Sequence, residues 1–481
     1  MSRQEEKVPS AADLLWFPCL SWAACHAGLG SKFRSRLLAT FTILYRLYPL
    51  ECTKIVIFHN SRIGGSHTVG GAKKDRNDLI NQVLLRPTVF KDEAPLSIEF
   101  VPARLPHRGD QLTFLAHLFR SLLEKPGTTG QRVLITGPVG TGKTVITQRF
   151  GLDIVRTAKE RKIGLRYVHV NCRECKGSLF AVLRKVMNEF EEQFPKRGFS
   201  SEELLQAILR ILDQKNLILI LALDELEALI EVDSSALYTL TRVQEDRVTA
   251  PIRLSLICML RELKYLEALD RSTVSTLQQN FIELKPYSSS ELVAILKDRV
   301  SLAFKEGTVQ DDTVEFAADV ASANGDARYA IELLWRSGKY ADSEESREVK
   351  PEHVRKAAAA VYPTLRDDHL ASLSINEKLF LLALSRSLEE NDQAYVNMGD
   401  LEKVYRVVCE EYNASARGHT QFWKYMRLLS ATGLISSKLS GKGTKGRTTL
   451  IGLTSIPASA MKECIESALE VFANARRSRP A

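Results

Sequence analysis

Short apolar runs alternate with longer segments of helical period along the middle of the chain. Runs that are apolar at nearly every position are typical of parallel strands buried on both faces, and helical segments between them are typical of crossover connections. This pattern predicts an α/β domain with a parallel sheet. The predicted strands are Arg132–Thr136, Leu165–Asn171, Leu217–Leu223, Ile252–Cys258 and Phe281–Leu284.

From Ser288 to about Val361 the apolar positions follow a helical period only, which predicts a helical bundle after the sheet. Its predicted helices are Ser290–Lys305, Asp311–Ala323, Ala327–Tyr340 and Pro351–Val361, with the Ser/Glu-rich stretch Asp342–Glu348 as a loop. Beyond Asp367 the pattern predicts three helices, a hairpin rich in Gly, Lys and Thr, and a last helix from about Pro457 to Ala475.

The length and composition of the chain indicate a soluble protein of several domains. It has 481 residues, of which 44% are hydrophobic and 26% charged. The formal net charge of +8 permits nucleic-acid binding without requiring it. Its distribution says more, because Arg417 to Arg447 holds seven Lys and Arg and no Asp or Glu. One short C-terminal stretch therefore carries a charge close to that of the whole chain.

Most of the eight cysteines are scattered, as buried thiols in a reducing compartment usually are. Cys172 and Cys175 form a CxxC pair, which in other proteins binds zinc or acts as a redox pair. A zinc site needs a second pair or histidines at suitable spacing, and none is close in the sequence. We predict ordinary thiols, with zinc and redox chemistry as the alternatives.

Residues 1–78 precede the first organised pattern. Leu14 to Ser31 is uncharged, but Pro18 and His26 interrupt it, and it lacks the basic flank and clear cleavage site of a signal peptide. Lys32 to Leu50 is basic and free of acids, which weakly resembles a transit peptide. We predict a poorly ordered extension, with a membrane or targeting role as the alternative.

A complete GxxxxGKT motif directly follows the first predicted strand and opens a helix. Glycines let the backbone wrap phosphate groups, and the N–H groups and helix N-terminus then supply positive potential. Lys143 is expected to neutralise the β- and γ-phosphates, and the Thr144 hydroxyl to ligate Mg²⁺. The motif therefore predicts a site for ATP or ADP with Mg²⁺. It consists of Gly137, Pro138, Val139, Gly140, Thr141, Gly142, Lys143 and Thr144.

An acidic pair, Asp224 and Glu225, ends the third predicted strand. This position suits Mg²⁺ binding by Asp224, and Glu225 is then the candidate base that activates the attacking water. Arg328 begins a helix after the sheet and is a candidate to reach back to the γ-phosphate. The alternative for the acidic pair is an ordinary helix N-cap followed by a first-turn acid, and the alternative for Arg328 is a surface arginine in the first turn of a helix.

Two helices, Glu402–Tyr412 and Thr420–Ala431, precede two strands, Leu434–Lys438 and Thr448–Leu453, and this order predicts a winged helix. The basic loop between the strands is the wing, which can lie along a phosphate backbone; a solvated loop without a ligand is the alternative. We expect Trp423 to pack rather than to contact bases. Phe422, Met426 and Leu429 are predicted core positions. The predicted DNA contacts are Gln421, Lys424, Lys442, Lys445 and Arg447.

In this order, the pieces resemble the archaeal origin-recognition initiators, a family that combines an AAA+ base, a helical lid and a winged helix. The resemblance runs from about Thr88 to the C-terminus. It rests on Val89–Glu93, Phe100–Arg108, the P-loop, Val170–Arg173, Leu223–Leu226, Leu237–Arg242, Pro286–Tyr287 and Gly325–Arg328. The implied domains are 79–286 as the AAA+ base, 287–362 as the lid and 366–477 as the winged helix.

The resemblance also implies roles for single residues. The segment around His107 and Arg108 would line the adenine pocket, with Tyr287 also at the nucleotide, and Arg328 would be the lid arginine that senses the nucleotide. The helix after Asn171 would be an insertion that touches the DNA minor groove.

Two departures from the family pattern concern hydrolysis. Arg261 stands where similar proteins usually carry an Asn that orients the attacking water, and the segment Asp270–Thr276 lacks the family's Asp-Pro-Arg run. Arginine has donors and no acceptor, so it cannot replace the amide. We therefore expect nucleotide binding with very slow hydrolysis. The alternative is that Arg261 stabilises the charge of the γ-phosphate, as an arginine finger does, and so helps hydrolysis.

We predict an ATP-binding DNA-replication initiator that recognises origin duplex DNA and helps to load the replicative helicase, with initiator paralogues as further partners. It is expected in the cytoplasm at the nucleoid, with no membrane partner. One alternative is a DNA-binding paralogue that holds nucleotide structurally and regulates replication or transcription. Another is a signalling or transposition-type AAA+ ATPase whose winged helix binds protein. Salt-sensitive duplex binding separates the first two from the third.

The extension yields the first prediction. A chain that begins at Arg76 should fold, bind ATP and bind DNA like the full chain, because residues 1–78 lack the pattern of a packed domain. Circular dichroism, nucleotide titration and DNA titration of the two chains provide the comparison. Loss of solubility or of either binding activity in the shorter chain would contradict it.

Overall fold

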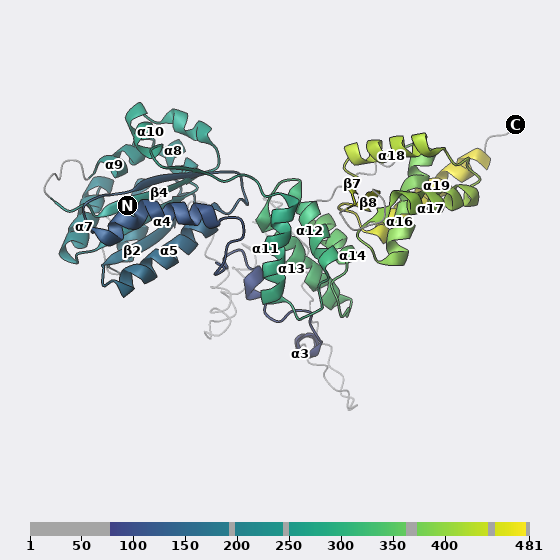
Figure 1. Ribbon diagram of the computed structural model, residues 1–481, viewed down its shortest axis with the longest axis horizontal. Helices are drawn as coiled ribbons and strands as arrows, with labels where there is room; N and C mark the ends of the chain where they lie inside the picture. The colour runs from purple at the N-terminus through teal and green to yellow at the C-terminus, as the bar shows by residue number, and fades with distance from the viewer. Residues whose placement is uncertain (1–76, 192–197, 244–249, 362–372, 441–447, 478–481) are drawn as a thin grey trace, which may run out of the picture. The chain divides into compact units, whose positions relative to one another are not determined.

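A computed structural model describes residues 77–191, 198–243, 250–361, 373–440 and 448–477 (Figure 1). The extension predicted over residues 1–78 therefore lies outside the described residues, except for its last two positions. These two begin helix α3 (Asn77–Leu85), which exposes its apolar side chains Ile80, Val83, Leu84 and Leu85.

A parallel sheet of five strands in the order β2-β3-β4-β1-β5 forms the centre of the first domain. Its strands are β1 (Arg132–Thr136), β2 (Leu165–Asn171), β3 (Ile218–Asp224), β4 (Leu254–Leu260) and β5 (Phe281–Glu283). Strands β3 and β4 are buried at every position, which explains why their sequences are continuous apolar runs. The predicted α/β fold is confirmed, and the predicted strand ends differ from these by at most two residues.

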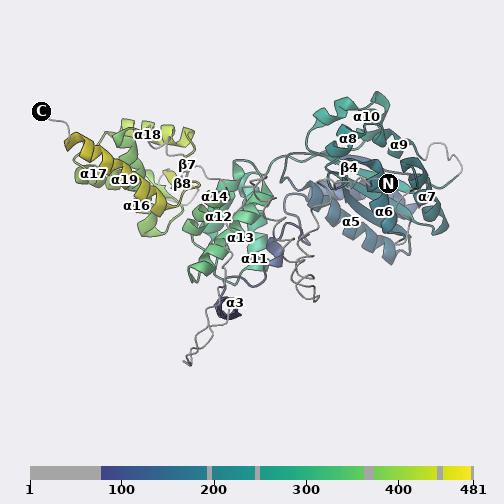
Figure 2. The same ribbon diagram turned by 180° about the vertical axis from the view of Figure 1, so that it is seen from behind.

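Helices cover both faces of this sheet (Figures 1 and 2). On one face pack α4 (Gly109–Glu124) and α5 (Lys143–Glu160), whose Phe119 and Phe150 rings lie 5.0 Å apart. The other face carries α6 (Leu179–Asn188), α7 (Ser201–Gln214), α8 (Glu227–Val232) and α9 (Ala236–Arg242). The 3₁₀ helix η3 (Leu263–Ala268), helix α10 (Arg271–Leu277) and β5 complete the domain.

The helical bundle consists of α11 (Ser289–Ala303), α12 (Asp311–Ser322), α13 (Ala327–Ser343) and α14 (Pro351–Val361). Three of its helices start where the sequence predicts, and α11 starts one residue before the predicted Ser290. Capping residues fix two of these starts: Ser288 forms a capping box with Glu291, and Asp326 caps α13. Helix α13 continues to Ser343, so it takes the first two residues of the stretch that we predicted to be a loop.

An earlier stretch of chain also belongs to this bundle's core. Val89, Phe90 and Leu96 are buried among lid residues, with Leu96 in the 3₁₀ helix η2 (Ala94–Leu96). The Phe90 ring lies 4.8 Å from that of Phe304. Residues 89–96, which the sequence boundaries assign to the base, therefore pack with the lid.

The C-terminal domain has the predicted winged-helix order. Its elements are α16 (Ile375–Asn391), β6 (Val396–Asn397), α17 (Met398–Glu411), α18 (His419–Ala431), β7 (Ile435–Leu439), β8 (Thr449–Leu453) and α19 (Ala458–Arg477). The two-residue strand β6, too short to leave a sequence signal, adds an edge to the antiparallel sheet β6-β8-β7. The three predicted core positions of α18 are buried, and Phe422 lies against the rings of Phe380 and Tyr405.

Two further features bear on function. Cys172 and Cys175 are buried free thiols, burial raises the pKa of each, and no cluster of His, Cys, Asp or Glu that could hold a metal occurs among the described residues. Among the described helices, none combines the length and the apolar character that a membrane span requires.

Candidate nucleotide-binding site

The predicted nucleotide site lies at the carboxyl edge of the parallel sheet. β4 lies between β1 and β3 and pairs with both, so the ends of these strands meet at one edge. The P-loop follows β1 and opens α5, and Asp224 ends β3. Topology thus brings together two motifs that are far apart in the sequence.

The backbone of the P-loop requires its glycines. Gly137, Gly140 and Gly142 have φ values of 151°, 76° and 92°, in the region that favours glycine. A side chain on Gly137 would collide with the carbonyl oxygen of Leu284, and one on Gly140 would collide with the Asp326 carboxylate. The loop is therefore a tight backbone turn whose N–H groups are available to phosphate.

The Lys143 side chain reaches back into this turn. Its Nζ donates to the carbonyl oxygens of Gly137 and Pro138, at 2.5 and 2.9 Å. Burial lowers the pKa of Lys143, whereas the nearby carboxylates of Asp224 and Glu227 act in the opposite direction. A bound phosphate would offer this ammonium a stronger, charged acceptor than two carbonyls.

Thr144 and Asp224 are in direct contact. The Thr144 hydroxyl donates to Oδ2 of Asp224 at 2.6 Å, and the amide of Glu225 donates to Oδ1 at 2.9 Å. Burial alone would raise the pKa of Asp224, but donors from His169 and Thr144 outweigh it and hold the pKa below its usual value. This donor set fits Mg²⁺, which is usually held by one or two protein oxygens plus water and phosphate, with Thr144 and Asp224 as the holders.

The candidate base Glu225 is bound by cations. Arg261, directly after β4, places Nη2 2.7 Å from Oε1 of Glu225 and Nε 2.9 Å from Oε1 of Glu227. The Nε of Arg173 lies 3.9 Å from the other oxygen of Glu225. Glu225 also has a φ of 48°, an uncommon conformation for its residue type. The structure thus pairs two of the predicted catalytic residues with each other.

Glu227 is a site residue that the sequence analysis missed. It lies in the first turn of α8, is 7% exposed and lines the same cavity as Lys143. Glu227 stands two residues after Glu225, where an acidic residue is common at the start of a helix, so the sequence carries no signal for its burial.

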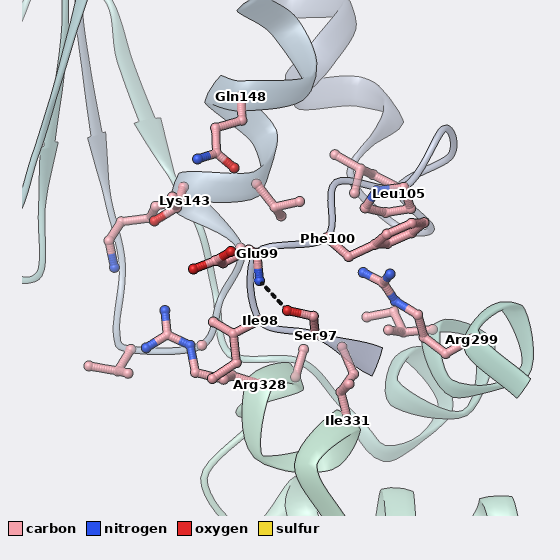
Figure 3. A pocket seen from close by; sticks show the side chains of 18 of the residues that line it. Ser97, Ile98, Glu99, Phe100, Leu105, Lys143, Gln148, Arg299, Arg328 and Ile331 are labelled. Atoms are coloured by element: carbon pink, nitrogen blue, oxygen red, sulfur yellow. Dashed lines mark hydrogen bonds between the residues drawn. The ribbon is translucent and has the colours of Figure 1, made fainter. Parts of the chain in front are cut away.

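A cavity of about 1190 Å³ opens beside the P-loop (Figure 3). Lys143, Thr144, Asp224, Glu225 and Arg261 line its polar end. Helix α13 contributes Arg328, which is exposed, points into the cavity and acts electrostatically on Lys143. The cavity wall also includes the apolar side chains Ile98, Phe100, Leu105 and Ile331. A charged end and an apolar wall suit a phosphate chain and a base, respectively.

The residues predicted for the adenine pocket lie in different places. Tyr287 lines the cavity. The side chain of His107 is exposed, and the neighbouring Leu105 and Pro106 line the cavity. Arg108 is buried beneath the P-loop. It stacks 3.9 Å from the ring centre of Tyr287 and donates to the carbonyl oxygens of Thr141 and Lys285. Arg108 therefore braces the loop and the tyrosine.

Arg299 on α11 is a second residue that the sequence analysis missed. It is buried, lies 4.9 Å from the ring centre of Phe100 and donates to the carbonyl oxygen of Pro95. These partners are about 200 residues away along the chain, and no local pattern predicts such a contact. Arg299 fixes the apolar wall that Phe100 contributes.

Comparison with known proteins gives the family. Residues 127–266 match the model of an AAA domain, residues 293–359 a Cdc6 AAA+ ATPase-type lid domain, and residues 368–463 the C-terminal winged helix domain of CDC6. The ORC1-type DNA replication protein 2 of Sulfurisphaera tokodaii is 36% identical over 391 residues, which cover 79% of this chain and 93% of the relative. The ORC1-type DNA replication protein of Thermococcus kodakarensis is 29% identical over 375 residues, 77% of this chain and 89% of the relative.

Solved structures agree. The crystal structure of Cdc6p from Pyrobaculum aerophilum has a TM-score of 0.72 at 30% identity and covers 80% of this chain and 99% of its own. The Aeropyrum pernix ORC1 protein in complex with DNA shares the fold, with a TM-score of 0.53 at 23% identity. The match covers 82% of this chain and 100% of that structure's chain. The resemblance found in the sequence is confirmed: the chain belongs to the ORC1/Cdc6 family of DNA replication proteins, nucleotide-binding AAA+ proteins with a helical lid and a C-terminal winged helix.

Proposed function

We propose that this chain is an ATP-binding replication initiator that recognises origin duplex DNA and helps to load the replicative helicase at the nucleoid. The observation that carries the proposal is the combination in one chain of a complete P-loop site, a lid arginine directed at it and a winged helix. Its relatives are named as DNA replication proteins, and the structure of one fold neighbour contains DNA. ATP would then control when the chain acts on DNA.

In this proposal each part of the site binds one part of the nucleotide. Lys143 and the P-loop amides bind the phosphates, and Thr144 and Asp224 hold Mg²⁺. Arg328 senses the γ-phosphate from the lid, and Tyr287 with the apolar wall accommodates the adenosine. The magnesium ion would supply charge neutralisation between the phosphates when bound.

We further propose that hydrolysis is very slow. The Glu225 carboxylate accepts from Arg261 at 2.7 Å and faces Arg173, so both of its oxygens already have cationic partners that compete with an attacking water molecule. Phosphoryl transfer depends on positioning, so a diverted base costs rate even when nucleotide binds well. The same contact favours a second candidate function, a DNA-binding paralogue that holds nucleotide structurally.

The proposed DNA surface is the winged helix. Gln421 and Lys424 are exposed on α18, and Trp423 is partly buried against the domain core, where its Nε1 donates to His419. The wing residues Lys442, Lys445 and Arg447 lie outside the described residues. Lys438 in β7 is 2.6 Å from Asp319, so this cation has a partner within the chain.

The helix after Asn171 is the second proposed DNA contact. Helix α6 buries its apolar face against the sheet domain and exposes Arg184 and Lys185, the latter paired with Glu174 at 2.7 Å. Its exposed basic face suits the predicted minor-groove contact.

Nucleotide affinity should depend on Lys143. Lys143→Ala removes the ammonium group and leaves the backbone turn, so affinity should fall at least about tenfold, or about 1.4 kcal/mol. Titration with a fluorescent ATP analogue measures this. Equal affinity of wild type and variant would contradict the role of the P-loop lysine.

Hydrolysis should respond to Arg261. Arg261→Asn releases Glu225 and supplies a side chain with both donor and acceptor, so single-turnover ATP hydrolysis should rise on the order of tenfold, about 1.4 kcal/mol of barrier. Glu225→Gln should abolish the residual rate. If the wild type hydrolyses ATP readily and Arg261→Asn is no faster, the idea that Arg261 restrains the base is refuted. If Glu225→Gln leaves the rate unchanged, Glu225 is not the base.

DNA binding should show different roles for the wing and the helix. Replacing Lys442, Lys445 and Arg447 by Ala should weaken binding to every duplex and flatten the log–log salt dependence by up to about 0.9 per lost phosphate contact. Changes at Gln421 and Lys424 should instead alter the preference among sequences. A triple variant that keeps the wild-type salt slope would show that the wing does not lie on the DNA backbone.

A further inference from the structure

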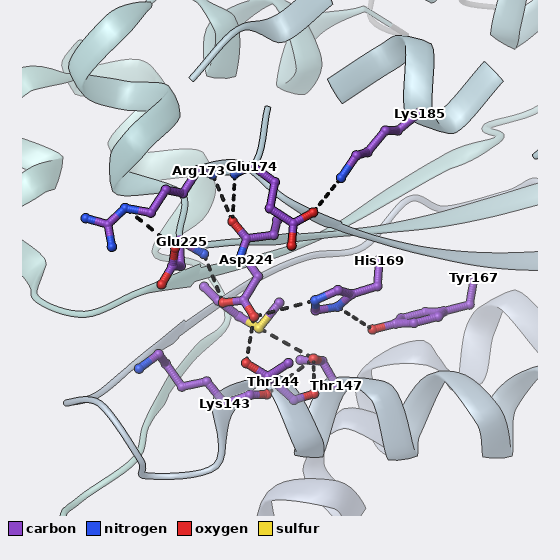
Figure 4. Close-up of polar contacts among 12 residues, drawn as sticks. Lys143, Thr144, Thr147, Tyr167, His169, Arg173, Glu174, Lys185, Asp224 and Glu225 are labelled. Carbon is purple, nitrogen blue, oxygen red and sulfur yellow. Dashed lines mark hydrogen bonds and ion pairs between the residues drawn. The ribbon is translucent and has the colours of Figure 1, made fainter. Parts of the chain in front are cut away.

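A row of polar side chains leads from β2 to the proposed magnesium position (Figure 4). Nε2 of His169 lies 3.5 Å from Oδ2 of Asp224, the same oxygen that accepts from Thr144. On the other side of the ring, Nδ1 of His169 lies 3.4 Å from the hydroxyl of Tyr167. The register of β2 and β3, in which Asn171 pairs with Asp224, places this row beside the end of β3.

The partners of His169 determine which nitrogen carries the proton. An ionised Asp224 accepts hydrogen bonds only, so the nitrogen that faces it must donate. On the opposite side of the ring, the Tyr167 hydroxyl lies 3.4 Å from Nδ1 and is able to donate to it. Both contacts fit a ring that carries a proton on Nε2.

The P-loop helix makes room for the tyrosine. Gly151 is buried in α5, and a Cβ at this position would lie 2.5 Å from the Tyr167 ring. Glycine in a helix interior costs about 1 kcal/mol relative to alanine, so helix propensity does not favour it here. The close approach of the tyrosine ring explains the residue, and it ties the ring to the helix that begins with Lys143 and Thr144.

We propose that His169, held by Tyr167, is a positioning residue for Mg²⁺: it donates to Asp224 and keeps the carboxylate aimed at the Thr144 hydroxyl and the metal position. This inference rests on the proposed nucleotide–Mg²⁺ site. The Asp224 side chain is 8% exposed, so bulk water cannot easily replace a lost donor, and the carboxylate would lose one of the contacts that fix its orientation. The hydroxyl that donates to Asp224 keeps its lone pairs free for the metal.

Mn²⁺ in place of Mg²⁺ gives a direct readout of metal binding. Electron paramagnetic resonance counts free Mn²⁺ while it is titrated into full-length protein loaded with ADP. His169→Leu should weaken Mn²⁺ binding by about 10- to 100-fold, the usual effect of losing a group that orients a metal ligand. His169→Gln, whose amide N–H can take the place of Nε2, should recover most of the affinity.

Two further variants test the support of the ring. Tyr167→Phe and Gly151→Ala should both weaken Mn²⁺ binding in the same direction, the second by displacing the tyrosine without changing a polar group. Arg166→Ala, at an exposed position of the same strand, should leave it unchanged. ADP affinity in EDTA should stay within about twofold of wild type in every variant, which also shows that each variant is folded.

The outcomes separate the two claims. Wild-type Mn²⁺ affinity in His169→Leu, or equal losses in the Leu and Gln variants, would overturn the positioning role while leaving the magnesium site intact. Wild-type protein that binds ADP without binding Mn²⁺ would overturn the magnesium site and the positioning role together. Loss of ADP affinity in EDTA by His169→Leu would show a structural role and contradict the proposal.

Discussion

The constraint on which the site depends is that parallel strands end at one edge of their sheet. Because β4 pairs with both β1 and β3, the P-loop, Asp224 and Arg261 emerge side by side, although they span more than a hundred residues of sequence. Crossover helices on both faces keep the strands dry and in register. A shift of β3 by one residue would move Asp224 away from Thr144 and separate the two halves of the site.

At this edge a few polar groups lie in contact with one another. Asp224 accepts from Thr144 and from the amide of Glu225 and lies 3.5 Å from Nε2 of His169, while Glu225 and Glu227 share Arg261. A buried carboxylate without such donors would be costly, so each partner helps to fix the orientation of the next. A nucleotide that enters therefore meets an arranged set of charges. On the proposed function, its γ-phosphate would compete with the glutamates for Arg261 and would so link nucleotide binding to the state of the candidate base.

The sequence predicted the parts that depend on local pattern or on a motif. Continuous apolar runs gave the strands of the sheet, and capping residues such as Ser288 and Asp326 gave helix starts. It did not predict contacts made by chain topology. Glu227 looks like an ordinary helix acid, Arg299 meets Phe100 across about 200 residues, and His169 reads as one more strand position until its pairing with β3 is known. For the same reason the sequence did not predict that Phe90 packs on Phe304, a contact that makes residues 89–96 part of the lid rather than of the base.

On the proposed function, one chain couples a nucleotide site to sequence-specific duplex binding. Footprinting of the full chain on chromosomal fragments, with ATP and with no nucleotide, tests both halves together. We predict protection of a few discrete segments and a change in the extent or affinity of that protection when ATP is added. Uniform weak protection of all fragments, or an identical pattern with and without ATP, would contradict it.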